Sequence, residues 1–86
     1  MLKVYAAEWC PHCVKTVEYL KANNIVFDYI DIETLDREVV DKIVEVNGGL
    51  DWIVPTLEYN GRWREGKVFN EAELAADLKD LGLELS

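Results

Sequence analysis

The order of apolar and polar positions along the chain predicts four strands. Leu2–Ala7 is apolar apart from one lysine, which indicates a buried strand. Ile25–Ile32 is rich in β-branched and aromatic residues, which favours a second strand. We expect a third strand at Thr56–Tyr59 and a fourth from Arg62 to about Val68, with Gly66 as a bulge.

Helical periodicity occupies the segments between these strands. The first helix is predicted at Pro11–Ala22, and three residues at a spacing of three form its core-facing side: Val14, Val17 and Leu20. A second helix is expected to begin after Thr34 or Asp36, since either residue can cap it, and to stop at Asn47-Gly48-Gly49. Its apolar side is formed by Val39, Val40, Ile43 and Val44.

Turn and cap residues set the order of the last elements. Asn60-Gly61 predicts a type I′ hairpin, because both central positions of that turn need positive φ. Asn70 and Glu73 resemble a capping box before a third helix, which Gly82 ends. The order βαβ followed by ββα predicts an α/β fold, with a four-stranded mixed sheet flanked by three helices. We expect one domain spanning residues 1–86.

Two cysteines carry the candidate chemistry. Cys10 and Cys13 are three positions apart, so a disulfide between them closes too short a loop to stabilise the fold. Cys10 falls at the helix N-cap, where free N–H groups and the helix dipole favour a thiolate. Pro11 suits the first helical position, and His12, when protonated, adds a positive charge that tunes the redox potential. Cys10 is therefore the predicted nucleophile, and Cys13 resolves the mixed disulfide.

Composition limits the other functions. The net charge of −8 argues against a nucleic-acid partner, and no run of about 18 apolar residues predicts a membrane helix. Because nothing at the N-terminus resembles a signal peptide, we expect a cytoplasmic protein, in which CxxC usually serves catalysis or metal binding. Zinc is an alternative, although four ligands would require a dimer. Cysteines serving only as small buried apolar residues are another. We expect a monomer without metal or bound cofactor, whose redox group is the Cys10–Cys13 disulfide.

The chain resembles the thioredoxin/glutaredoxin superfamily over essentially its whole length. Three features carry the resemblance: Cys10-Pro11-His12-Cys13 at the first strand–helix junction, Val54-Pro55-Thr56 before the third strand, and the βαβ–ββα order. The resemblance implies a thioredoxin fold and a cis Pro55 packed against the sulfurs. It also implies that the backbone of Val54 pairs with an extended substrate segment. Trp9, next to Cys10, is expected either to contact partner proteins or to cover the active-site helix.

The subfamily features are mixed. The length resembles glutaredoxins, whereas Ala7-Glu8-Trp9-Cys10 and Val54-Pro55-Thr56-Leu57 look like thioredoxins, except that Val4 replaces the buried acid of their first strand. Glu8 stands where glutaredoxins carry a basic residue, and Glu65–Asn70 lacks the second glycine of their glutathione-binding pattern.

We therefore expect reduction of protein disulfides, with a flavin-dependent thioredoxin-type reductase as the electron donor. Glutathione is the alternative donor, because Arg62, Arg64 or Lys67 could turn toward the groove.

Overall fold

Four strands form one mixed sheet in the computed structural model, which describes residues 1–83; the last three residues of the predicted 1–86 domain lie outside the described residues. The elements are β1 (Leu2–Ala6), α1 (Pro11–Ala22), β2 (Phe27–Asp31), the 3₁₀ turn η1 (Ile32–Thr34), α2 (Arg37–Val46), β3 (Thr56–Tyr59), β4 (Arg62–Arg64) and α3 (Glu71–Leu81). The strand order is β2-β1-β3-β4, in which β1 and β2 are parallel and the other pairs antiparallel. This confirms the predicted thioredoxin fold.

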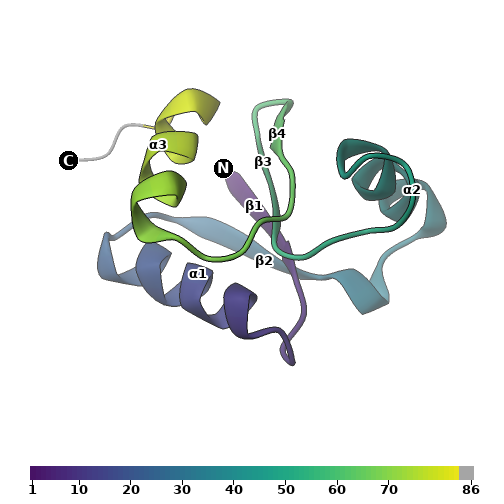
Figure 1. Cartoon of the computed structure of the whole chain (residues 1–86), viewed down its shortest axis with the longest axis horizontal. Coiled ribbons are helices and arrows are strands. Elements are labelled where there is room, and N and C mark those ends of the chain that lie inside the picture. The colour runs from purple at the N-terminus through teal and green to yellow at the C-terminus, as the bar shows by residue number, and fades with distance from the viewer. Residues whose placement is uncertain (84–86) are drawn as a thin grey trace.

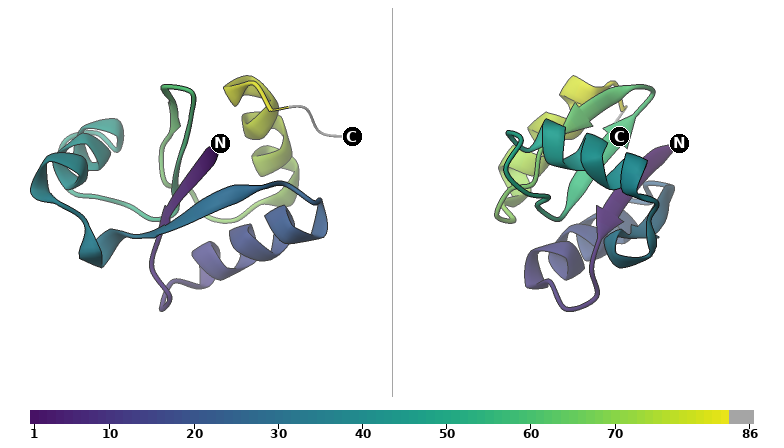
Figure 2. Two further views of the ribbon diagram at one scale, coloured as in Figure 1. Left: turned by 180° about the vertical axis from the view of Figure 1, so that it is seen from behind. Right: turned by 90° about the vertical axis from the view of Figure 1, so that its right-hand side faces the viewer.

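The helices cover both sides of the sheet, with α1 and α3 on one side and α2 on the other (Figures 1 and 2). Alternate residues of β1 are buried toward the two layers. Val4 is fully buried, and Tyr5 stacks on Trp63 with ring centroids 5.7 Å apart. Leu20, Ile43 and the α3 residues complete the core: Leu74, Leu78 and Leu81. No helix among residues 1–83 is long and apolar enough to cross a membrane.

The turns and two of the caps follow the predictions. Asn60 and Gly61 have φ values of 50° and 85°, as the type I′ turn requires. The side chain of Asn70 accepts the backbone N–H of Glu73 at 2.9 Å, and Gly82 ends α3 in the left-handed conformation. Helix α2 begins directly after Asp36 and ends at the predicted Asn47, although the side chain of Asp36 makes no cap hydrogen bond.

Strand β1 ends one residue earlier than predicted, and β2 and β4 are several residues shorter. The N–H of Ile25 donates to the carbonyl of Leu20 at 2.9 Å, so Ile25 closes the end of α1 and β2 begins only at Phe27. The N–H of Gly66 donates to Asn47 Oδ1 at 2.7 Å, and β4 ends at Arg64. Gly66 is therefore not the expected bulge.

Close packing explains the glycine at position 66. A Cβ on Gly66 would lie 2.3 Å from Cγ2 of Ile53 and 3.0 Å from its backbone carbon, far inside van der Waals contact. The backbone of the segment after β4 can approach the segment before β3 only because this side chain is missing.

The buried side of α1 also differs from the prediction. Its buried residues are Cys13, Thr16 and Leu20, whereas Val14 is 45% exposed and Val17 is half-buried. A spacing of three falls short of the 3.6-residue turn, so three apolar residues at that spacing drift around the helix. Val14 and Val17 consequently lie toward the surface beside Cys13.

Candidate active site

The sheet topology brings three loops together at one end of the strands. Helix α1 begins just after the end of β1, and the antiparallel register pairs Tyr5 with Thr56. This pairing places Val54 and Pro55, which precede β3, beside the loop that carries Cys10. Strand β4 returns antiparallel to β3, so the segment that follows Arg64 reaches the same end.

Cys10 is the N-cap residue of α1, as predicted. Its Sγ accepts the backbone N–H of Cys13 at 3.3 Å, and its S–H donates to the carbonyl of Val54 at 3.8 Å. Pro11 occupies the first helical position. The sulfur therefore lies where a developing thiolate meets a backbone donor and the positive end of the helix.

Cys13 lies deeper, and both cysteines are free thiols. Its side chain is 1% exposed. Burial, followed by the side-chain hydrogen bond with Cys10, raises the pKa of Cys13 to about 12. Cys13 therefore keeps its proton at neutral pH.

The Val54–Pro55 peptide bond is cis, which confirms the expectation drawn from the resemblance. Asn47, at the end of α2, supports this segment in a way that the sequence did not reveal. Its Nδ2 donates to the hydroxyl of Thr56 at 2.9 Å, and that hydroxyl donates to the carbonyl of Ile53 at 2.6 Å. In the sequence, Asn47 indicated only the end of a helix, and nothing there marked it as this connection.

Trp9 extends outward beside the cysteines. Its side chain is 64% exposed and its indole N–H donates to Glu33, while its ring lies at 50° to that of Trp52 with centroids 6.4 Å apart. This exposure favours the reading of Trp9 as a contact surface over that of a closed cover. Glu33, which holds the ring, carried no sequence pattern that marked it.

Comparison with known proteins places the chain in a family. The family model described as glutaredoxin matches residues 2–63. The chain belongs to the glutaredoxin family. A glutaredoxin-like 8.6 kDa protein from the rubredoxin operon of Clostridium pasteurianum is 36% identical over 78 residues, covering 86% of this chain and 92% of the relative. This membership supports thiol–disulfide oxidoreductase chemistry in general.

Solved structures agree with the family and the fold. The crystal structure of a glutaredoxin from Archaeoglobus fulgidus has a TM-score of 0.68 and 28% identity, covering 87% of this chain and 82% of that one. A crystal structure of a thioredoxin-like protein has a TM-score of 0.66 and 25% identity, covering 88% of this chain and 97% of that one. The chain thus has both glutaredoxin-named and thioredoxin-named structural neighbours.

His12 makes a contact that the sequence did not predict in this glutaredoxin-family site. Its Nδ1 accepts the backbone N–H of Phe69 at 3.2 Å, which fastens α1 to the segment before α3. His12 thus has a structural contact in addition to the tuning role that the sequence predicts. The carbonyl of His12 also accepts the hydroxyl of Thr16 at 2.7 Å.

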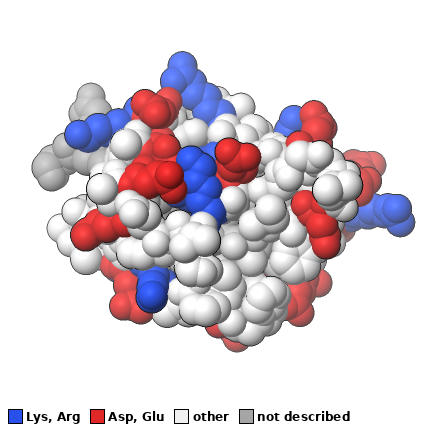
Figure 3. Space-filling model, viewed as in Figure 1, with Lys and Arg blue, Asp and Glu red and all other residues white. Residues whose placement is uncertain are grey.

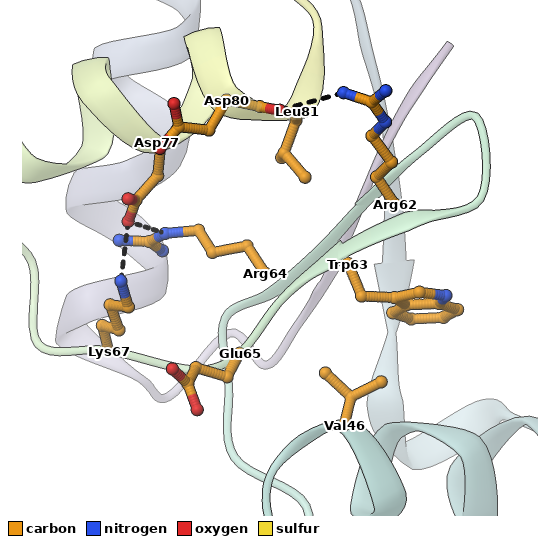
Figure 4. Close-up of a pocket in the computed structure, with 9 residues that line it drawn as sticks. All are labelled: Val46, Arg62, Trp63, Arg64, Glu65, Lys67, Asp77, Asp80 and Leu81. Carbon is orange, nitrogen blue, oxygen red and sulfur yellow. Dashed lines mark hydrogen bonds and ion pairs between the residues drawn. The ribbon is translucent and has the colours of Figure 1, made fainter.

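The cations of the last hairpin turn toward α3. Arg64 and Lys67 both donate to Oδ2 of Asp77, at 2.8 and 2.9 Å, and Arg62 donates to the carbonyl of Asp80 at 3.2 Å (Figure 4). They line a cavity of about 450 Å³ that also contains three acidic residues: Glu65, Asp77 and Asp80. All three cations are thus bonded to acceptors within this chain.

No group of three or more His, Cys, Asp or Glu side chains among residues 1–83 is arranged to hold a metal ion.

Proposed function

We propose that this glutaredoxin-family protein reduces protein disulfides through Cys10 and Cys13 and receives its electrons from a flavin-dependent thioredoxin-type reductase. The supporting observation is the pairing of an N-cap sulfur, which accepts the Cys13 N–H, with a buried Cys13 thiol whose pKa is about 12. The disulfide of the two cysteines is the redox group, and no bound cofactor is invoked. The proposed setting is the reducing cytoplasm, with the protein acting as a monomer.

The reaction proceeds in two exchanges. The Cys10 thiolate attacks one sulfur of the substrate disulfide, that S–S bond breaks, and the first substrate thiolate leaves. Cys13 then gives up its proton and attacks Cys10 Sγ, which releases the second substrate thiolate. Two electrons pass to the substrate, and the Cys10–Cys13 disulfide forms.

The backbone and surface beside the sulfurs suit an extended protein segment. The backbone of Val54 lies within 3.8 Å of Cys10 Sγ, so a segment pairing with Val54 would present its sulfur to Cys10. Figure 3 shows a broad uncharged area at the lower centre of the face seen in Figure 1. Exposed apolar side chains near the site include Trp9, Ile53 and Val68. Surfaces of this kind favour contact with another protein.

Charge also argues for a protein donor over glutathione. Glu8 is exposed two positions before Cys10, where a carboxylate repels the two carboxylates of glutathione. Arg64 and Lys67 are both bonded to Asp77. A protein reductase needs neither cation, because its contacts are made through apolar surface and backbone.

The test compares the two donors under matched conditions. NADPH consumption is followed with insulin disulfides as substrate, first with a thioredoxin-type reductase and then with millimolar glutathione and glutathione reductase. We expect the flavoenzyme to support much faster turnover. Cys10→Ser should abolish turnover, and Cys13→Ser should accumulate mixed disulfides.

Two charge variants sharpen the comparison. Glu8→Lys should raise the glutathione-dependent rate, whereas Asp41→Lys, the same charge change on α2, should not. Efficient glutathione turnover without any response to the flavoenzyme would overturn the proposed donor. Turnover by Cys10→Ser would overturn the assignment of the nucleophile.

A further inference from the structure

A cavity of about 300 Å³ lies between α1 and the edge strand β2, on the far side of the cysteines from the Val54 backbone. Eight residues line it: Ala7, Glu8, Cys13, Val14, Val17, Glu18, Lys21 and Tyr29. Sheet order separates the two places, because β1 leads to Cys10, β3 follows Val54, and β2 lies on the opposite side of β1. The cavity therefore lies on the opposite side of β1 from the Val54 backbone, with which the substrate segment is proposed to pair.

The walls of this cavity are apolar. Val14 and Val17 lie here instead of in the core, and Tyr29 is 43% exposed on β2. Tyr29 pairs with Val4 in the parallel register, so it projects from the side of the sheet that α1 covers. The two valines and the tyrosine ring thus form an open, largely apolar cavity beside Cys13.

The lining of this cavity carries more negative than positive charge. Glu8 and Glu18 line the cavity, and Asp31 lies near Tyr29. Burial raises the pKa of Tyr29, and the nearby carboxylates of Glu8 and Asp31 raise it further. Lys21 is the one cation in the lining, and it follows Cys13 by eight positions, or roughly 12 Å along the helix axis.

We propose that this cavity holds a long cationic side chain, arginine or lysine, of the protein partner while the partner's disulfide reacts at Cys10; this inference rests on the proposed function. The methylene stem packs against Val14 and Val17, and the ring of Tyr29 faces the cation. The carboxylates of Glu8 and Glu18 neutralise its charge. A volume of about 300 Å³ is at the small end of ligand cavities, which suits one side chain. The cavity thereby gives the protein a preference for positively charged substrates, whereas pairing with Val54 involves only the substrate backbone.

The test uses a panel of disulfide-linked peptides. Arginine is placed at each position within four residues of the reacting cysteine, and each peptide is compared with its citrulline analogue, which keeps the shape without the charge. At the best position, we expect kcat/KM for the arginine peptide to exceed that for the citrulline peptide about three- to tenfold, a range set by exposed cation–π and ion-pair contacts. The ratio should fall as salt is raised to about 0.5 M.

Variants locate the preference in the cavity. Tyr29→Leu and Glu18→Gln should each lower the ratio and together bring it close to one, whereas Glu45→Gln, which removes a charge from α2, should leave it at the wild-type value. In amide NMR spectra, N-acetyl-arginine N-methylamide should shift the resonances of Val14, Val17 and Tyr29, and the citrulline analogue should not.

The outcomes separate this inference from the proposed function. Equal reduction of arginine and citrulline peptides would refute the cationic site and leave the oxidoreductase proposal standing. A preference that survives both cavity variants would also refute it, and would assign the effect to the net charge of −8. Failure of the wild-type protein to reduce any peptide would contradict the proposed function itself.

Discussion

Selective alkylation provides a direct measure of the asymmetry between the two cysteines. With a pKa of about 12, Cys13 is a thiolate in only about one molecule in 10⁵ at pH 7. An ordinary cysteine, with a pKa of about 8.5, is a thiolate in about one molecule in 30. The thiolate fraction of Cys13 is thus about 3,000-fold lower. The Cys13 thiolate is intrinsically more nucleophilic, which offsets about 30- to 40-fold of this difference at a Brønsted slope near 0.45. The expected reaction rate of Cys13 is therefore about 100-fold below that of an ordinary cysteine.

The assay is brief exposure of the reduced protein to iodoacetamide at pH 7, followed by mass spectrometry of the peptides. We expect Cys10 to carry the label, while Cys13 reacts at least about 100-fold more slowly than a cysteine in an unfolded peptide. Its 1% exposure adds a steric barrier to this value. Denatured protein is the control, in which the two sites should react alike. Comparable labelling of both cysteines in the folded protein would refute the reasoning.

Three further predictions follow from other contacts. His12→Ala should lower the reduction potential measured against a glutathione buffer, on a scale of roughly 30 mV per 1.4 kcal/mol. An unchanged potential would show that the ring serves only as the acceptor for the N–H of Phe69. Asp77→Asn should destabilise the protein by about 1–3 kcal/mol in urea unfolding, because Arg64 would be left buried without its carboxylate. Burial alone would raise the pKa of Asp77, but hydrogen bonds from Arg64 and Lys67 hold it below its usual value. This stabilisation is complete above the unfolded-state pKa of about 3.9 and is lost as pH falls through the lowered folded value, which acid unfolding of the variant and wild type should show. Gly66→Ala should cost about 1–3 kcal/mol in the same assay, since its Cβ would overlap Ile53, and a neutral result would mean that the segment before β3 can shift.

The sequence predicted the elements whose local pattern is unambiguous. Helix α1, strand β3 and the Asn60-Gly61 turn occur where expected, because a proline at the first helical position, a β-rich run and paired positive-φ residues each act locally. The cis bond before Pro55 also followed, but from the resemblance and not from local propensity.

Tertiary contacts account for the differences. Ile25 is β-branched, yet its N–H is held by the end of α1, and no local pattern reports that hydrogen bond. Gly66 has the composition of a bulge, but a side chain 13 residues earlier, Ile53, explains it. Val14 and Val17 have helical apolar spacing, and only the packed sheet determines that the neighbouring side of α1 is buried.

The residues of the candidate site were likewise predictable only in part. Cys10 and Cys13 were predictable because a CxxC at a helix N-terminus is local chemistry. The supporting contacts were not predictable. Asn47 reaches Thr56 from the end of α2, and Phe69 reaches His12 across 57 positions of sequence. Such contacts depend on where loops meet, which the sequence pattern does not encode locally.

The fate of the Cys13 proton follows from the buried residues around it. Val4 is fully buried in β1, where the resemblance to thioredoxins would place an acid that accepts this proton. Burial, the largest cause of the raised pKa of Cys13, persists in the mixed disulfide, so its deprotonation in the proposed mechanism is aided by a base. The departing substrate thiolate is such a base, since an ordinary thiol has a pKa of about 8.5 and its thiolate is released as Cys13 attacks. In the proposed mechanism, substrates whose leaving thiol is more basic therefore assist the proton transfer while slowing departure, and we expect the balance of these two effects to influence which substrates react fastest.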